Sequence, residues 1–201
     1  MITRCAIALL GPLDSAAPPP GIAPDSWRAA LAEDVADLLA NLANVQGAVA
    51  VVAADQALAG ALIWPDTPIF TVATARPVAA LQAAAEAGYT EAAVIAADAP
   101  DLPALHIGKL FRGLGSHPVA AAPASGGGLV ALAARLPVPA WLVAADPELD
   151  EATVASLRAA APEPRSVAQS PSWHRLRVPT DIRRLDPGLE GWEATRALLT
   201  G

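Results

Sequence analysis

The sequence predicts a single α/β domain with three layers, in which helices cover both faces of a mostly parallel central sheet. The length of 201 residues suits one domain with one core. Short apolar runs alternate with segments of helical periodicity, which is typical of parallel strands joined by crossover helices. One of these runs, residues 93–97, has no polar side chain on either face, as expected for a central strand covered on both sides.

The first half of the chain alternates strands and helices. Asp25 or Ser26 can cap the first helix, and Gly88 can end the second. The expected strands are residues 5–10, 48–53 and 69–73, and the expected helices are residues 26–42 and 76–88.

The second half is expected to continue the same pattern, with one hairpin. Pro103 fits the first turn of a helix, where its missing amide hydrogen costs nothing. The last helix could pack on the sheet or form a homodimer. The expected strands are residues 119–122, 129–133, 165–168 and 174–178, and the expected helices are residues 103–114, 147–161, a short one from about 180, and 191–199.

Composition and charge exclude several classes of function. The formal net charge of −7 argues against binding a nucleic acid polymer, which requires clustered Lys and Arg. No apolar run is long enough to span a membrane, and Gly11 and Pro12 end the first run too early for a secretory signal, so we expect a cytoplasmic protein. The single Cys5 cannot form an internal disulfide and is expected to be buried and inert.

Two carboxylates follow the central strand, in the segment AADAPDLP. Asp98 would stand beyond the carboxyl end of the strand, where α/β sheets bind their ligands, and Asp101 would follow in the same loop. Acids in such a place can hold a divalent cation against a phosphate. The alternative interpretation is that Asp101 caps the next helix, which is the commoner role of a loop aspartate.

This segment resembles the metal-binding turn of GT-A fold nucleotidyl- and glycosyltransferases, above all a bacterial branch that carries Gly-Thr-Asp-Cys-Pro-Asp-Leu-Pro there. Guanylyltransferases of molybdenum cofactor and deazaflavin synthesis carry a shorter Gly-Asp-Xaa-Pro version. The resemblance implies a GT-A-like fold, Asp98 as ligand of Mg²⁺ or Mn²⁺, and Asp101 as the second acid of a catalytic site. It also implies a nucleotide or nucleotide sugar as substrate and an acceptor that the sequence does not identify.

Two further places resemble the family but depart from it. The relatives carry Pro-Ala-Xaa-Asp-Gly-Gly-Tyr where this chain has Gly126, Gly127 and Gly128, so the turn acid is lost although the glycines could still line a nucleotide pocket. A hairpin turn explains the same glycines without a ligand. Later, the relatives carry Asp-Xaa-Asp-Thr-Pro-Glu-Asp-Leu, and both leading acids are replaced, by Arg175 and Arg177.

The arginines and histidines leave two interpretations open. Arg177 could replace the metal by contacting a diphosphate directly, because guanidinium forks pair well with phosphate oxygens. The bland alternative is that the basic cluster formed by Arg175, Arg177, Arg183 and Arg184 is a solvated strand edge and helix end. The three histidines are far apart in the sequence and are expected at the surface.

Three hypotheses of function follow. The first is a GT-A type transferase that uses a nucleoside triphosphate or nucleotide sugar, with a metal at Asp98 and a pocket lined by residues 126–128. The second is a protein that keeps the fold but binds a nucleotide or a partner protein without turnover, because the departures fall on the catalytic positions. The third is an unrelated flavodoxin-like binding domain, which the missing phosphate loop after the first strand disfavours.

Overall fold

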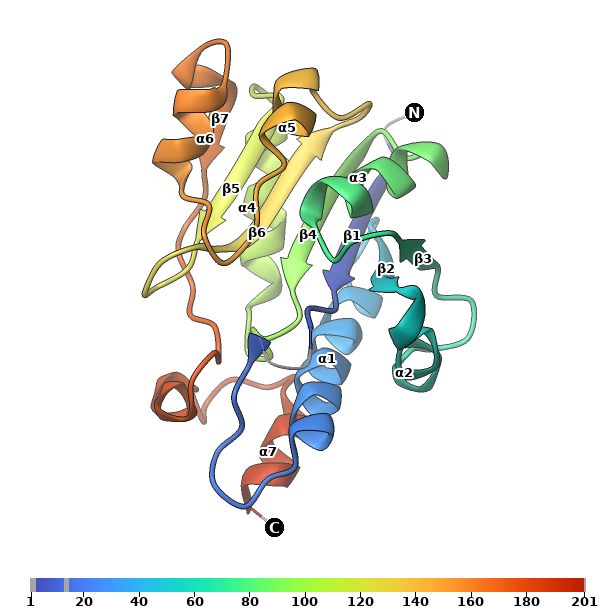
Figure 1. Ribbon diagram of the computed structural model, residues 1–201, viewed down its shortest axis with the longest axis vertical. Coiled ribbons are helices and arrows are strands. Elements are labelled where there is room, and N and C mark those ends of the chain that lie inside the picture. Colours follow the sequence, from blue (N-terminus) through green and yellow to red (C-terminus); the bar gives the residue numbers. More distant parts are fainter. Residues whose placement is uncertain (1–2, 13–14, 201) are drawn as a thin grey trace.

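A computed structural model describes residues 3–12 and 15–200, which form a seven-stranded sheet with the strand order β3-β2-β1-β4-β6-β5-β7 (Figure 1). Neighbouring strands pair in parallel except at β6, which is antiparallel to β4 and to β5. This confirms the mostly parallel sheet. The strands are β1 (Arg4–Leu9), β2 (Gln46–Val52), β3 (Ile69–Val72), β4 (Glu91–Ala96), β5 (Val119–Pro123), β6 (Leu129–Arg135) and β7 (Val167–Gln169).

Helices cover both faces of the sheet, which confirms the predicted three layers. Side chains of α1, α2 and α4 share one hydrophobic cluster with the sheet, and those of α3, α5 and α6 share the other. Figure 1 shows α3 and α5 in front of the sheet and α4 behind it. The α-helices are α1 (Pro24–Ala40), α2 (Gln56–Leu62), α3 (Pro77–Glu86), α4 (Ala104–Leu114), α5 (Ala140–Ala145), α6 (Val154–Ala160) and α7 (Glu193–Thr200). Short 3-10 helices cover Ala53–Asp55, Pro164–Ser166 and Pro179–Arg184.

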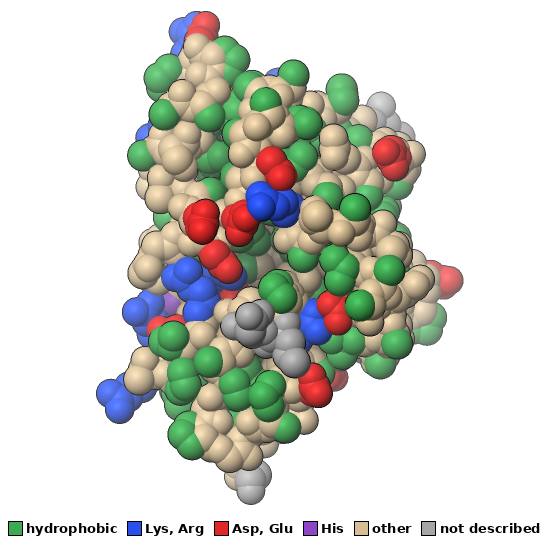
Figure 2. Space-filling view, in the orientation of Figure 1, with side chains coloured by type: hydrophobic (Ala, Val, Ile, Leu, Met, Phe, Trp, Pro, Cys, Tyr) green, Lys and Arg blue, Asp and Glu red, His purple; other side chains and the backbone are tan. Residues whose placement is uncertain are grey.

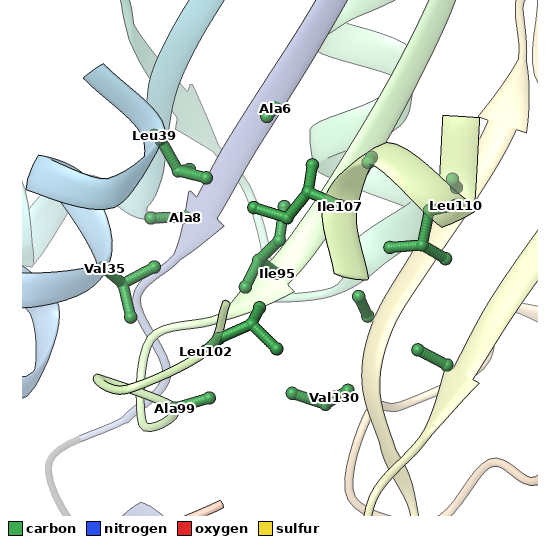
Figure 3. Close-up of a cluster of buried hydrophobic side chains, with 14 of the residues drawn as sticks. Ala6, Ala8, Val35, Leu39, Ile95, Ala99, Leu102, Ile107, Leu110 and Val130 are labelled. Carbon is green, nitrogen blue, oxygen red and sulfur yellow. The ribbon is translucent and has the colours of Figure 1, made fainter. Parts of the chain in front are cut away.

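The core is built from apolar side chains of the strands and helices, many of them alanine. Figure 3 shows Ile95 of β4 beside Ile107 of α4, and Leu39 of α1 beside Ala8 of β1. Because alanine fills little space, the helices can approach the sheet closely and seal both faces. Cys5 lies in this core with no exposed surface, and burial raises its thiol pKa to about 12, which agrees with an inert thiol.

The start of α1 differs from the expectation. The N-cap residue is Ala23, no side chain caps the helix, and Pro24 stands in its first turn. Asp25 and Ser26 therefore lie inside the helix. Proline has no amide hydrogen to leave unsatisfied at this position and its fixed φ suits a helix start, so the proline determines the boundary.

Two predicted elements of the second half differ from the structure, the helix at 147–161 in part and the strand at 174–178 entirely. Residues 147–153 are not helical, because α6 begins only at Val154, where Thr153 and Ser156 exchange the two hydrogen bonds of a capping box. Residues 174–178 form no strand. Instead, the backbone of this segment joins a loop, since the Leu176 amide donates to the Asp98 carbonyl at 2.8 Å.

The last helix, α7, packs on α1 rather than on the sheet. The buried Asp34 of α1 accepts hydrogen bonds from the backbone amides of Ala194 (2.9 Å) and Thr195 (2.8 Å) in the first turn of α7. The homodimer expected of this helix is not tested by the structure of one chain. Among the described residues, no helix combines the length and the apolarity that a membrane crossing requires.

Candidate functional site

A cavity of about 250 Å³ opens beyond the carboxyl ends of β1 and β4. These two strands are the topological switch point of the sheet, because the chain passes from β1 to β2 and β3 on one side and returns to β4 on the other. Ligands bind at such points in open α/β sheets. The described walls come from the end of β1 and the loop after it (residues 9–12 and 15–16), from Arg28, Leu31 and Ala32 of α1, from residues 74–76 after β3, from the end of β4 and the loop after it (residues 96–98), from residues 148–150, and from Arg175.

The structure places Asp98 in the wall of this cavity, two residues after the end of β4. Its side chain is buried, with a residue exposure of 6%. Both carboxylate oxygens are engaged by one guanidinium, because Arg175 donates from Nε to Oδ1 at 2.6 Å and from Nη2 to Oδ2 at 2.8 Å. Such a two-point contact is the strongest form of ion pair that a protein offers.

Arg175 does not lie where the solvated interpretation of the basic cluster placed it. It was expected at a solvated strand edge, but it is 5% exposed and lines the cavity. Its Nη1 donates to the Leu129 carbonyl at 3.2 Å and lies 2.6 Å from Oδ1 of Asp150. Burial opposes its charge, but the negative charges of Asp98 and Asp150 outweigh burial and raise the Arg175 pKa. The guanidinium therefore remains charged in the site.

These residues do not fit a resident divalent cation at Asp98. Both oxygens of its carboxylate face Arg175, which would repel a cation. Within the described ranges, no three His, Cys, Asp or Glu side chains are grouped so that they could hold a metal ion. The predicted Mg²⁺ or Mn²⁺ ligand role of Asp98 thus requires Arg175 to move away first.

Asp101 lies outside the cavity and joins loops together. Its carboxylate accepts a hydrogen bond from Trp173 Nε1 at 3.1 Å, lies 2.9 Å from His174 Nε2, and accepts weakly from the Asp186 amide at 3.4 Å. The side chain has no exposed surface. Its contacts are structural, and its predicted catalytic role is not tested by them. His174 was expected at the surface, but its side chain is only 12% exposed and its ring stacks on Trp173.

The glycine turn connects β5 to β6, as the hairpin interpretation predicted. Gly126, Gly127 and Gly128 all have positive φ angles, of 99°, 103° and 78°. Arg177 donates from Nη2 to the Gly127 carbonyl at 2.9 Å, and Arg184 donates to the Ser125 carbonyl at 3.0 Å. None of the three glycines, nor Arg177, belongs to the cavity wall. The turn and the Asp98 cavity are therefore separate features, and the predicted nucleotide-binding role of these residues is untested.

Two further arginines reach the cavity, and both are paired with acids. Arg28 of α1 donates to both carboxylate oxygens of Asp55 at 2.9 and 2.6 Å, and this hydrogen bonding lowers the Asp55 pKa. Arg76 contacts Glu148 and lies 3.3 Å from Asp146. Figure 2 shows acidic and basic side chains gathered beside one another near the middle of this face. Arg28, Arg76 and the acidic segment were not among the site residues predicted from the sequence.

We name residues 146–150 the acidic strap. They connect α5 to α6 and carry three carboxylates, on Asp146, Glu148 and Asp150. The first two contact Arg76, and the third contacts Arg175. Two of the three cavity arginines are thus neutralised by one short segment. A composition signal was present, since three acids alternate within five residues, but a predicted helix concealed it.

Comparison with known proteins supports the fold. Residues 38–147, more than half of the chain, match the model of a family described as "Uncharacterized protein conserved in bacteria (DUF2064)". This match includes Asp98 but ends before Asp150 and Arg175. A search of curated proteins found no significant match.

Three solved structures illustrate the likeness. A protein of Desulfovibrio desulfuricans G20 assigned as a nucleotide-diphospho-sugar transferase has a TM-score of 0.69 and 20% identity, with 99% of this chain and 97% of that chain covered. The 4-diphosphocytidyl-2C-methyl-D-erythritol synthase of Anaerococcus prevotii DSM 20548 has a TM-score of 0.64 and 10% identity, covering 98% and 96%. Rv0371c of Mycobacterium tuberculosis H37Rv, in complex with manganese, has a TM-score of 0.50 and 14% identity over the whole of both chains. At these identities the likeness establishes the fold, and the GT-A-like fold that the resemblance implied is confirmed.

Proposed function

We propose that this chain, which belongs to the DUF2064 family, binds a nucleotide or nucleotide sugar in the cavity beyond β1 and β4 and acts there as a nucleotidyl- or glycosyltransferase. The fold, which is similar to that of solved transferases, supports this class of protein. The residues that line the cavity support the substrate class.

One observation carries the proposal. Arg28, Arg76 and Arg175 come from three separate segments of the chain, and all three line one cavity at the switch point of the sheet. Guanidinium groups recognise phosphate oxygens through forked hydrogen bonds. The inner wall adds apolar side chains, including Leu9 and Leu31, which suit the base or sugar of a nucleotide.

The chemistry asked of these residues is electrostatic. In nucleotidyl or glycosyl transfer, negative charge develops on the departing phosphate group, so fixed positive groups aimed at it stabilise the transition state. The cavity arginines would supply such charge. A divalent cation at Asp98 would do the same when bound, but the contact between Asp98 and Arg175 does not fit one, so no step of the proposal depends on it.

A second candidate function is nucleotide or partner binding without turnover. The same contact favours it, because the carboxylate that relatives use for the metal is fully committed to Arg175. In either case we keep the further expectations of the sequence as proposals. These are a cytoplasmic location, no nucleic acid polymer as partner, and a homodimer.

The test is titration calorimetry of the purified chain with a panel of nucleoside triphosphates and nucleotide sugars, in EDTA and in Mg²⁺ or Mn²⁺. We expect binding of at least one nucleotide, and its loss in Thr74→Trp, which adds bulk at the cavity wall. Thr71→Trp is the matched control, because Thr71 is an exposed threonine three residues earlier, on β3, and lies outside the wall. Binding by neither class of nucleotide under any condition would refute the proposal.

Turnover separates the two candidate functions. A transferase that uses a nucleoside triphosphate releases pyrophosphate when an acceptor is present, and one that uses a nucleotide sugar releases a nucleoside phosphate. Both products are detected by ³¹P NMR. Binding that Thr74→Trp abolishes, with no product from a range of acceptors, would favour the binding protein.

A further inference from the structure

We propose that the Arg175 guanidinium takes the place of the divalent cation at Asp98, so that this chain binds the diphosphate group of its nucleotide directly and without a metal. The inference rests on the proposed function and names the group that holds the phosphates. The sequence argument had considered Arg177 for this role. The structure assigns it to Arg175, because Arg175 contacts the Asp98 carboxylate and lines the cavity, whereas Arg177 contacts the glycine turn.

The hydrogen-bonding capacity of Arg175 leaves room for a phosphate. A guanidinium carries five N–H groups. Two of them point to Asp98 and one to the Leu129 carbonyl, and these bonds fix the plane of the group. One Nη2 hydrogen has no acceptor among the described residues, and the last Nη1 hydrogen faces Asp150. Asp98 thus fixes the orientation of the Arg175 guanidinium. The two N–H groups that are not bound to Asp98 or to Leu129 remain for a ligand.

The contact with Asp150 is the replaceable one. The Asp98 side chain is 7% exposed, whereas that of Asp150 is 50% exposed. Ion pairs that open to water contribute little free energy, so a phosphate oxygen can replace the Asp150 carboxylate at small cost. The same holds across the cavity, where Arg76 is paired with Glu148, whose side chain is 45% exposed. The acidic strap therefore occupies the two arginines until a phosphate arrives.

A metal site and a phosphate-binding arginine predict opposite effects of removing Asp150 on nucleotide affinity. If Asp150 were a metal ligand, its removal would weaken nucleotide binding. If it competes with phosphate for Arg175, its removal strengthens binding. Glu151 provides a matched control, because it is the next acid along the chain, is exposed, and has no described ion pair.

The probes are inorganic pyrophosphate and any nucleotide that binds in the titration described above. Binding is measured by titration calorimetry of the full chain, in EDTA and in excess Mg²⁺ or Mn²⁺. We expect binding in EDTA and no gain in affinity with either metal. Asp150→Asn should bind pyrophosphate up to about fivefold more tightly than the wild type, and Glu151→Gln should not differ from the wild type.

Arg175 itself is tested by substitution. Arg175→Met should lose about tenfold to a hundredfold in affinity, since charge-assisted hydrogen bonds are lost. Arg175→Lys keeps the positive charge but not the forked guanidinium, so its affinity for pyrophosphate should lie between those of the wild type and Arg175→Met. Arg183→Met is the control for charge, because Arg183 is exposed and has no described partner. Circular dichroism and the melting temperature establish that each variant is folded.

Three results would overturn the inference. They are pyrophosphate binding that requires Mn²⁺, binding that weakens in Asp150→Asn, and Mn²⁺ binding seen by electron paramagnetic resonance that Asp98→Asn abolishes. Failure of pyrophosphate to bind at all would also refute it. Conversely, metal-free pyrophosphate binding through Arg175 without binding of any nucleotide would uphold this inference and refute the proposed function.

Discussion

Asp98 and Arg175 are 77 positions apart in the sequence, yet their side chains meet in a two-point ion pair of 2.6 and 2.8 Å at the cavity wall. The Leu176 amide binds the Asp98 carbonyl at 2.8 Å, so backbone and side chain together tie the C-terminal segment to the end of β4. Whatever binds in the cavity therefore meets Arg175 alongside Asp98, and the two residues form one unit.

The first prediction concerns the stability of this unit. Removal of one partner leaves the other as a buried charge, so Asp98→Ala should destabilise the fold by about 3 kcal/mol. Arg175→Met should cost a similar amount, and the double variant should cost much less than the sum, because neither charge is then left unpaired. Urea unfolding of all four proteins measures the coupling. Asp25→Ala, at an exposed position without a described partner, is the control. Additive losses would show that the pair is not coupled.

Local patterns in the sequence were sufficient for the seven strands, although they also predicted an eighth at residues 174–178, and for the place of Asp98. Residues 93–97 predicted a central strand, because consecutive apolar residues indicate burial on both faces of the sheet. Asp98 is the next residue after this run. The start of α1 was misplaced for a local reason as well, since Pro24 competes with Asp25 and Ser26 for the role of start signal.

The rest of the site depends on contacts between distant segments. The sequence around Arg175 does not reveal that this segment forms a loop in which Arg175 pairs with Asp98. The basic character of the segment favoured a solvated position instead. Residues 147–153 have helical spacing, but Thr153 caps a shorter helix and leaves the strap free to reach Arg76 and Arg175. Single-sequence periodicity carries no information on such pairings.

The second prediction assigns Asp101 a structural role. Asp101→Ala leaves Nε1 of the partly buried Trp173 without its acceptor, which should cost about 1 to 3 kcal/mol and change the tryptophan fluorescence of the folded protein. Asp37→Ala is a closely matched control, because Asp37 also accepts from a tryptophan Nε1, that of Trp64, at 2.8 Å, but Trp64 is 61% exposed. It should cost under about 1 kcal/mol. Equal losses in the two variants would contradict the assignment.

The third prediction separates two glycines of the same turn. A Cβ at Gly128 would lie 2.5 Å from the Leu149 carbonyl oxygen, whereas one at Gly127 would meet nothing within 4 Å. Both residues have positive φ, so Gly127→Ala should cost about 1 kcal/mol from backbone strain alone. Gly128→Ala must also displace the backbone of the acidic strap, and it should cost at least about 2 kcal/mol more. Thermal unfolding of both variants provides the comparison, and indistinguishable melting temperatures would disprove the packing argument.

The fourth prediction uses the buried Asp34, which joins α1 to α7. Burial raises the Asp34 pKa to about 6 from an ordinary value of 3.8, although its hydrogen bonds with Thr195 and Ala194 lower it. Between these two pH values the folded protein keeps a proton that the unfolded chain has lost. The contribution of Asp34 to the free energy of unfolding is therefore fully present below about pH 4. It is lost as the pH rises to about 6, by up to about 3 kcal/mol.

Chemical unfolding of the wild type and of Asp34→Asn across this pH range measures the difference. The wild type should lose stability relative to the variant as the pH rises, while Glu33→Gln, at the exposed neighbouring acid, should follow the wild type. Parallel profiles for the wild type and Asp34→Asn would show that Asp34 titrates alike in the folded and unfolded chains.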